Sequence, residues 1–309
     1  MNESSTNVTA ALQYQNFFPI PMIKNVIVVV LGICINYING ILIHTFHNHQ
    51  IFYMNPRYIL FIHLVINDMI QLTLTVSLVV ISYTINKISV SVCCILTLLA
   101  VITTENSPLN LACMAVERYV AICHPLHHLQ ICTVRRTLIL VGLMWVTTSV
   151  SALPDLFITL ATQPLSFFHS QLLCLRQNVF PNPIIVQKMD VTYTVYLVII
   201  WFIIFYTYFR ILFTARTASK DAKKARNTIL LHGFQLLLCM AMYIYPQLLS
   251  ALTQWFPKNF ADSSFVCYVI VQVLPRSISP VIYGVRDNTF RKYLKKHMFF
   301  RAGHSNKPL

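Results

Sequence analysis

The chain has 309 residues, of which 56% are hydrophobic and only 10% are charged, and its formal net charge is +14. A water-soluble globular domain carries about 25% charged residues, so the composition excludes an ordinary soluble protein and favours a chain surrounded mostly by lipid. Anionic lipid next to a basic membrane face accounts for the positive charge, so no nucleic-acid partner is needed.

Residues 1–23 precede the first long apolar run. They lack the basic start and the apolar core of a cleavable signal peptide. Two acceptor sequences for N-linked glycosylation lie here, at Asn2 and Asn7. If this segment is extracellular, as the basic residues below indicate, both asparagines are expected to be glycosylated.

Seven apolar runs follow, each close to the roughly 20 residues that a helix needs to cross a hydrocarbon core of about 30 Å. Read by hydropathy, they cover residues 24–46, 58–83, 93–122, 138–161, 191–213, 228–250 and 265–284. We therefore predict an all-α membrane protein. It would form a single domain over residues 1–309, with a seven-transmembrane helix bundle over residues 24–284.

The Lys and Arg residues orient this bundle. Of 23 such residues, 17 fall in the loops, helix ends and tail on the side opposite the N-terminus. The exceptions are Lys24, Lys87, Arg176, Lys188 and Lys258 on the N-terminal side, and Arg276 within the seventh span. By the positive-inside rule, the N-terminus is extracellular.

The segment 285–309 is then cytoplasmic. Its stretch "DNTFRKYLKKHMFF" places Phe290, Leu294 and Met298 on one stripe, with the basic residues largely off that stripe. This pattern predicts a short amphipathic helix that lies on the inner membrane surface and contacts lipid. A disordered basic tail is the alternative.

Two of the nine cysteines fall where a disulfide can form. Cys93 begins the third span on the outer side, and Cys174 is the only cysteine in the long outer loop, residues 162–190. A Cys93–Cys174 disulfide would hold this loop over the mouth of the bundle. The adjacent Cys94 is an alternative partner.

Four stretches resemble the signatures of odorant receptors, within the rhodopsin-like G-protein-coupled receptors. "MAVERYVAICHPLHH" (114–128) is similar to the odorant-receptor motif that opens the second inner loop. "KARNTILLHGF" (224–234), "SPVIYGVRD" (279–287) and "MNPRY" (54–58) resemble the family's entry to span six, end of span seven and entry to span two. In this motif Glu117 stands where many members have aspartate, and histidines follow in the loop; both features look most like fish odorant receptors.

Three departures from the family pattern stand out. Ser279 replaces the asparagine beside the span-seven proline, and Asn39-Gly40 reverses the usual order in span one. Span six, "LLLCMAMYIYP", lacks the Cys-Trp-x-Pro of most other rhodopsin-like receptors, as odorant receptors generally do. The first two put in doubt the usual water or sodium network around Asp68.

The resemblance implies a conformational switch at the inner end of span three. Glu117 would hold Arg118 in a charge-assisted pair, and opening of the bundle would expose Arg118 to a heterotrimeric G protein, expected to be the olfactory Gs type. A static ion pair that fixes helix depth is the alternative. Further residues expected to reorganise or to border the cleft are Tyr119, Tyr283, Lys223, Lys224 and Arg226. The family also implies plasma-membrane localisation in the cilia of olfactory sensory neurons.

The resemblance places a small, sparingly polar odorant in the outer half of the bundle. The candidate ligand-binding residues are Val101, Thr104, Glu105, Tyr193, Tyr196, Met240, Tyr243 and Ile244.

Asp68, Glu105 and Arg276 are ionisable side chains that fall near the middle of their spans, where they are functional candidates. We expect Arg276 to be neutralised by Asp68 or Glu105, in place of the network that Ser279 weakens. An alternative role for Glu105 is to anchor a cationic odorant.

Other classes fit less well. His124, His127 and His128 with Cys123 could suggest a metal site, but a solvated loop explains them better, so neither metal nor cofactor is expected. An intramembrane enzyme would need a nucleophile–base or metal-ligand pair within the spans, and a transporter often shows an internal repeat. The sequence shows neither feature. The alternatives to an odorant receptor are a rhodopsin-like receptor for a peptide or lipid and, less favoured, a channel or transporter.

Overall fold

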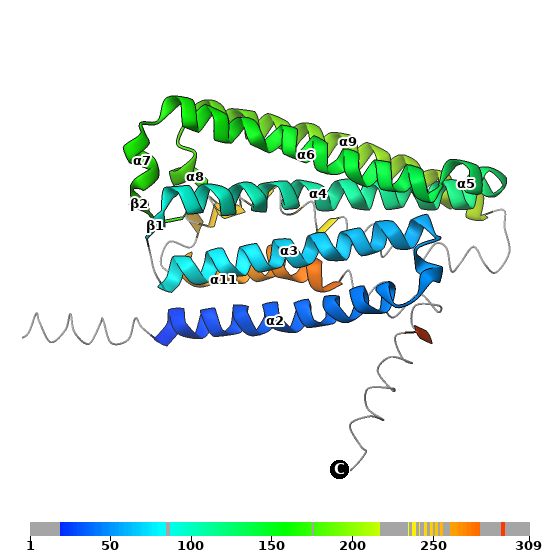
Figure 1. Ribbon diagram of the computed structural model, residues 1–309, viewed down its shortest axis with the longest axis horizontal. Helices are drawn as coiled ribbons and strands as arrows, with labels where there is room; N and C mark the ends of the chain where they lie inside the picture. Colours follow the sequence, from blue (N-terminus) through cyan, green and yellow to red (C-terminus); the bar gives the residue numbers. More distant parts are fainter. Residues whose placement is uncertain are drawn as a thin grey trace, which may run out of the picture.

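The structure is a bundle of long helices that run roughly parallel or antiparallel to one another (Figure 1). The computed structural model describes residues 19–84, 87–174, 176–216, 260–278 and 292–293, with scattered helical positions between 234 and 255. Five described helices are long and apolar enough to cross a membrane: Met22–His47, Pro56–Ile81, Val90–Cys123, Val134–Thr162 and Pro183–Thr214. They match the first five predicted spans and confirm an all-α membrane protein. Most of the predicted sixth span and of the amphipathic helix at 285–309 lies outside the described residues.

The elements follow one another with short connections. In chain order they are α2 (Pro19–His47), η1 (Gln50–Phe52), α3 (Pro56–Thr84), β1 (Ile88–Ser89), α4 (Val90–Cys123), α5 (Pro125–Ile131), α6 (Val134–Thr162), α7 (Leu165–His169), β2 (Gln171–Leu172), α8 (Arg176–Val179), α9 (Pro183–Arg216), α11 (Phe260–Tyr268) and η3 (Val269–Val273), a π-helical segment. Residues 274–278 continue η3 as an α-helix, within the predicted seventh span.

Helices α3 and α9 both begin at an Asn-Pro dipeptide, Asn55-Pro56 and Asn182-Pro183. The side-chain Oδ1 atoms of Asn55 and Asn182 each accept a hydrogen bond from the backbone N–H two residues further on, at 3.0 Å and 2.9 Å. A capping asparagine with proline at the first helical position favours a helix start. The prediction that α9 begins at 191 was therefore wrong: α9 begins at Pro183, and Lys188 lies on this helix rather than in a loop.

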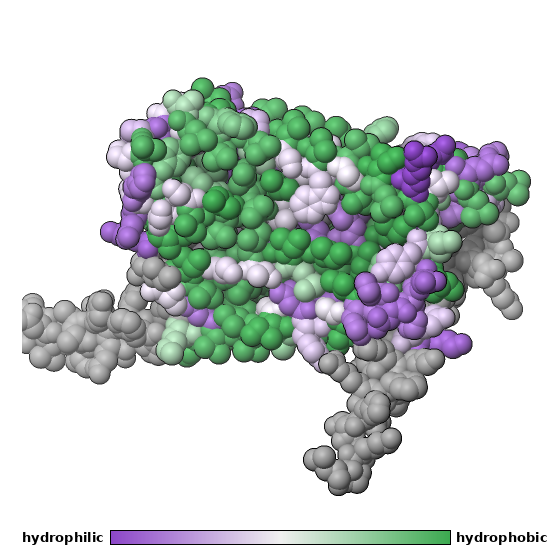
Figure 2. All heavy atoms as spheres, in the orientation of Figure 1, coloured by the Kyte–Doolittle hydropathy of each residue, from purple (hydrophilic) through white to green (hydrophobic). Residues whose placement is uncertain are grey.

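Helix α4 is the centre of the described bundle. It packs against α3, α6 and α9, and 56% of its apolar window is buried, compared with 17–33% for the other four membrane-length helices. Those other helices turn apolar side chains outward, as hydrocarbon-facing helices do; Ile33, Val150 and Phe202 are examples. Figure 2 shows apolar atoms over much of the bundle, with hydrophilic residues gathered mainly towards its two ends.

One end of the bundle is covered by the chain between α6 and α9; we call it the disulfide end. Cys93 and Cys174 form a disulfide there, as predicted, and Cys94 is a buried free thiol. Strand β2 pairs with β1 next to the start of α4, so that Ile88 lies opposite Leu172. The opposite end of α4 carries α5, and we call it the α5 end (Figure 1).

Candidate functional site

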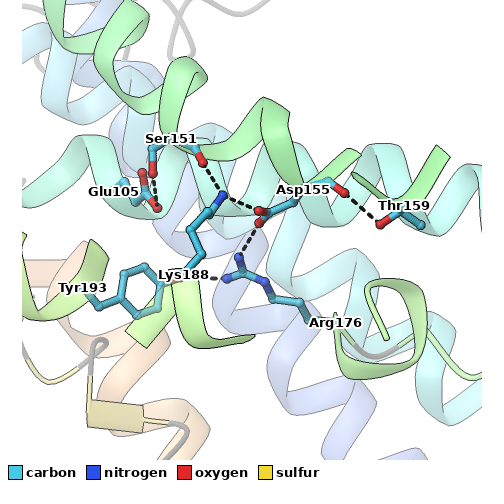
Figure 3. Close-up of polar contacts among 7 residues, drawn as sticks. All are labelled: Glu105, Ser151, Asp155, Thr159, Arg176, Lys188 and Tyr193. Atoms are coloured by element: carbon cyan, nitrogen blue, oxygen red, sulfur yellow. Dashed lines mark hydrogen bonds and ion pairs between the residues drawn. The ribbon is translucent and has the colours of Figure 1, made fainter. Parts of the chain in front are cut away.

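The disulfide end holds an ion cluster with one acceptor and two basic donors. Asp155 of α6 accepts from Nη2 of Arg176 in α8 at 3.1 Å and from the ammonium of Lys188 in α9 (Figure 3). The aspartate is only 2% exposed. Because each oxygen of Asp155 binds a different basic residue, one carboxylate ties α6, α8 and α9 together.

The two basic side chains also contact other polar groups. Nη1 of Arg176 donates to the hydroxyl of Tyr193 at 2.8 Å, and Nζ of Lys188 donates to the carbonyl oxygen of Ser151 at 2.7 Å. Arg176 is two residues beyond Cys174 in the chain. The disulfide therefore holds the segment that brings the Arg176 guanidinium to the cluster.

Glu105 of α4 lies at the edge of this cluster and is less well satisfied than Asp155. Its Oε1 accepts a long hydrogen bond of 3.4 Å from the Ser151 hydroxyl (Figure 3). Its Oε2 is buried and has no hydrogen-bond partner among the described residues. A buried carboxylate with one unused oxygen is costly to hold without a partner.

A second polar region joins α3 to α4 and α6 near mid-bundle. Asn67 donates to the Ser107 hydroxyl at 2.8 Å, and that hydroxyl donates to Asp68 at 3.3 Å. Trp145 Nε1 donates to His63 Nε2 at 2.8 Å. These bonds satisfy polar groups that would otherwise be costly inside a membrane bundle.

Arg276 lies just beyond η3 and is buried, as an ionisable residue of the seventh span was expected to be. Its Nη2 donates to Oε1 of Gln272 at 3.3 Å. Of the two carboxylates expected to neutralise it, Glu105 instead bonds to Ser151. Pairing of Arg276 with Asp68, which is also buried, stays a prediction.

At the α5 end, Glu117 binds a residue that the sequence did not suggest. Its Oε1 lies 3.0 Å from Nε2 of His128, and the side chain of Glu117 is almost fully buried. Burial and the nearby charge of Glu117 raise the pKa of the Cys132 thiol, at the end of α5. The expectation that His128 lies in a solvated loop was wrong, because His128 joins α5 to α4.

Tyr119, two residues beyond Glu117 on α4, contacts α9. Its hydroxyl lies 3.2 Å from Nε2 of His124, and its ring makes an edge contact with Tyr206 at a centroid distance of 5.9 Å. Cys123 and Thr214 approach to 3.4 Å at the ends of α4 and α9. The predicted switch segment thus contacts both α5 and α9.

Comparison with known proteins identifies the architecture. The sequence model of the seven-transmembrane receptors of the rhodopsin family matches residues 38–283. The chain belongs to this family. The receptor is 30% identical over 275 residues to Odorant receptor 131-2 of Danio rerio, covering 88% of this chain and 84% of the relative.

Two mammalian relatives share less of the length. Olfactory receptor 51E1 of Homo sapiens is 26% identical over 210 residues, or 64% of this chain and 63% of the relative. Olfactory receptor 1078 of Rattus norvegicus is 30% identical over 200 residues, or 60% and 57%. The resemblance to odorant receptors, with a fish receptor among the relatives, is confirmed. This is a family of membrane receptors rather than of enzymes, and it implies a small-molecule ligand and a G-protein partner.

The predicted ligand-binding residues of the receptor fall in several places. Tyr193 joins the ion cluster through Arg176, and Tyr196 lies three residues further along α9. Thr104 is turned towards α3, where it binds Gln71, and Val101 packs with Ala152 of α6. Ile244 is 55% exposed, which suits a lipid-facing side chain better than a pocket wall.

Several predicted residues lie outside the described part of the receptor. They are Asn2, Asn7, Lys223, Lys224, Arg226, Met240, Tyr243, Ser279 and Tyr283. Arg118 is described and half-buried beside Glu117, and its role as a switch stays a prediction. Among the described residues, no group of three or more His, Cys, Asp or Glu is arranged to hold a metal ion.

Sequence reasoning missed Asp155, which organises the cluster. The signal was available, because Asp155 falls inside the predicted span 138–161 and an ionisable residue there is a functional candidate. Its partners could not be found in the same way. Arg176 and Lys188 were assigned to the outer loop, and nothing in the local sequence indicates that both turn back towards α6.

Proposed function

We propose that the receptor is an odorant-activated G-protein-coupled receptor of the plasma membrane. A small molecule would bind at the disulfide end, and a cleft would then open at the α5 end and promote nucleotide exchange on a heterotrimeric G protein. The observation that carries this proposal is the match to the rhodopsin family over residues 38–283, with Glu117 and Arg118 at the end of α4 opposite the disulfide. In this proposal the N-terminus and the disulfide end face outward, and Asn2 and Asn7 are glycosylated.

The disulfide end has the features that a ligand site needs. Glu105, Tyr193 and Tyr196 bring a carboxylate and two phenols to the region where α4, α6 and α9 meet. The ion cluster of Asp155 ties α6 to α8 and α9, and a few polar groups at set positions are typical of small-molecule sites. Met240 and Tyr243 of the predicted sixth span would complete the pocket.

The α5 end has the features of a releasable contact. Glu117 is held by a single described histidine at 3.0 Å, and a switch needs two packings that differ by only a few kcal/mol. Movement of α4 against α5 and α9 would separate Glu117 from His128 and expose Arg118 to the G protein. Tyr119, Tyr283, Lys223, Lys224 and Arg226 would line the opened cleft.

The finer parts of the proposal come from the odorant receptors that the chain resembles. They are coupling to a Gs-type protein, residence in the cilia of olfactory sensory neurons, and an amphipathic helix at 285–309 that contacts lipid. The basic residues on the side opposite the N-terminus support this orientation next to anionic lipid.

The test is nucleotide exchange on a Gs-type protein, read out as cAMP in cells that express the receptor and are exposed to an odorant panel. Arg118→Ala should abolish both basal and ligand-dependent signals while surface expression is retained. Arg135→Ala removes another guanidinium at the same end, from an exposed position, and should leave the signals unchanged. Equal signals from the receptor and from Arg118→Ala would refute the proposal.

A receptor for a peptide or a lipid is the second candidate within the same fold. It would show the Arg118-dependent signal but respond to no volatile or water-soluble odorant. A channel or transporter would instead show ion or solute flux that Arg118→Ala leaves intact.

A further inference from the structure

Glu105 lies midway along α4, below the ion cluster of Asp155, and no described protein group explains its unused oxygen. Glu105 is 2% exposed, and its Oε2 has no hydrogen-bond partner among the described residues. The hydrogen bond to its Oε1 is long, at 3.4 Å, and comes from a neutral hydroxyl. A carboxylate in this situation is stabilised by any donor that reaches it.

The nearby basic groups do not supply that donor. Lys188 donates to Asp155 and to the carbonyl oxygen of Ser151, while Arg176 donates to Asp155 and Tyr193. Figure 3 shows the Lys188 ammonium directed at Ser151 and Asp155, with Glu105 on the far side of Ser151. Both cations therefore have the same carboxylate, Asp155, as their first partner.

Because both oxygens of Asp155 already bind basic side chains, the site favours a cationic ligand over an anionic one. An anionic ligand that sought Arg176 and Lys188 would compete with a carboxylate that already holds both and is 2% exposed. A ligand with an N–H donor breaks no described hydrogen bond of Glu105, because it meets an oxygen that has no described partner. Charge-assisted hydrogen bonds are roughly twice as strong as neutral ones, so an ammonium group fits better than a hydroxyl.

The phenols of α9 favour the same chemistry. Tyr193 and Tyr196 lie three residues apart on α9, which packs against α4, the helix that carries Glu105. Tyr193 already has a cation near its ring, because the Arg176 guanidinium lies 6.0 Å from the ring centroid. The half-buried ring of Tyr196 can contact a second cation, since tyrosine rings attract ammonium groups.

We propose that the ligand of this receptor is a small amine, whose protonated nitrogen binds Oε2 of Glu105 beside Tyr196. The inference rests on the proposed function, because it names the chemical class of ligand for the same site. It assigns Glu105 to ligand recognition and Asp155, with Arg176 and Lys188, to holding the site in shape.

The test compares matched ligands on matched variants. The probes are primary amines with straight-chain, cyclic and aromatic skeletons, and the alcohol and carboxylic acid of each skeleton. The receptor, Glu105→Gln and Asp190→Asn are each assayed for G-protein activation. Asp190 is an exposed carboxylate two residues beyond Lys188, so Asp190→Asn makes the same change of charge outside the site.

Amines should activate the receptor at concentrations at least about tenfold lower than the matched alcohols and acids. Glu105→Gln should raise the amine concentration required by about tenfold or more, and Asp190→Asn should change it by less than about twofold. Acids or alcohols that are as potent as amines would overturn the inference. An amine response that Glu105→Gln leaves intact would also overturn it.

A second measurement separates this inference from the proposed function. Amines should raise the melting temperature of the purified full-length receptor and of Asp190→Asn, but not of Glu105→Gln, because a ligand stabilises the state that it binds. If this pattern holds without any Arg118-dependent signal, the amine site stands and the proposed coupling fails. If the signal is present but no amine stabilises the receptor, the amine site is refuted and the coupling stands.

Discussion

The two ends of the helix bundle hold buried acidic side chains in opposite ways. At the disulfide end, Asp155 is shared by two basic residues from two other elements, and a disulfide and a strand pair fix the chain above it. At the α5 end, Glu117 meets one histidine from a short helix of seven residues. The first arrangement requires several contacts to break together, whereas the second depends on one described contact.

This difference matches the two tasks that the proposed function gives to the two ends. A ligand site gains affinity when its walls are already in place, because binding then costs less ordering. A switch must instead leave its resting state at a cost of only a few kcal/mol. The receptor thus combines a preorganised end and a releasable end on one central helix.

The largest effect is expected when the disulfide is removed. Cys174→Ser should destabilise the receptor by about 2–4 kcal/mol and sharply lower its surface expression, since the loop that carries Arg176 loses its anchor. The measurement is the fraction of receptor labelled at the cell surface. Cys94→Ala is the matched control, because it removes the adjacent thiol and keeps the disulfide. Equal expression of the two variants would show that the disulfide end is no firmer than the α5 end.

Asp155→Asn should lower the free energy of unfolding by about 3 kcal/mol, because it leaves two largely buried cations without their carboxylate. Thermal melting of the purified receptor without ligand measures the loss. Addition of Lys188→Gln should recover part of it by removing one of those cations. A melting temperature no lower than that of Asp190→Asn would mean that the ion cluster does not hold the helices.

His128→Ala tests the releasable end. Loss of a contact worth about 1 kcal/mol should shift the balance towards the open state and raise basal signalling by about fivefold. The neighbouring His127 is exposed, so His127→Ala should leave basal cAMP unchanged. If both variants have the basal signal of the unmodified receptor, the Glu117–His128 contact does not restrain the switch.

The smallest effect is expected for an ion pair that belongs to neither end of α4. Nζ of Lys24 lies 2.6 Å from Asp262, but the aspartate side chain is 71% exposed. Lys24 itself is buried, but solvent screens a pair whose acceptor is exposed, so Lys24→Gln should change the unfolding free energy by less than about 1 kcal/mol. Melting curves beside those of Lys87→Gln, an exposed lysine, would measure it. A loss as large as that of Asp155→Asn would mean that burial of the acceptor does not distinguish the pairs.

Sequence patterns predicted the features that depend on local composition. Lipid requires about 20 apolar residues per span, so hydropathy located five helices that the structure describes. The disulfide could be predicted because Cys174 is the only cysteine of its loop. The Asn182-Pro183 helix start was also readable, and its omission misplaced the start of α9 and hence Lys188.

The contacts that the sequence did not reveal join residues from different helices. Glu117 and Arg118 are adjacent in sequence, so they suggested a pair, yet the described partner of Glu117 is His128 on α5. Likewise, Ser151 rather than Arg276 binds Glu105. A backbone turns its side chains by about 100° per residue in a helix, so small differences in helix start decide which partner is reached. Hydropathy alone does not fix those starts.

The Asn182 cap therefore sets a rule for insertions and deletions. One residue added between Pro183 and Lys188 would rotate the ammonium by about 100° around α9 and move it away from Asp155. One residue added before Asn182 would lengthen the loop and leave Lys188 on the same side of α9, facing Asp155. Natural or engineered length variation should thus be tolerated up to the cap and rejected immediately after it.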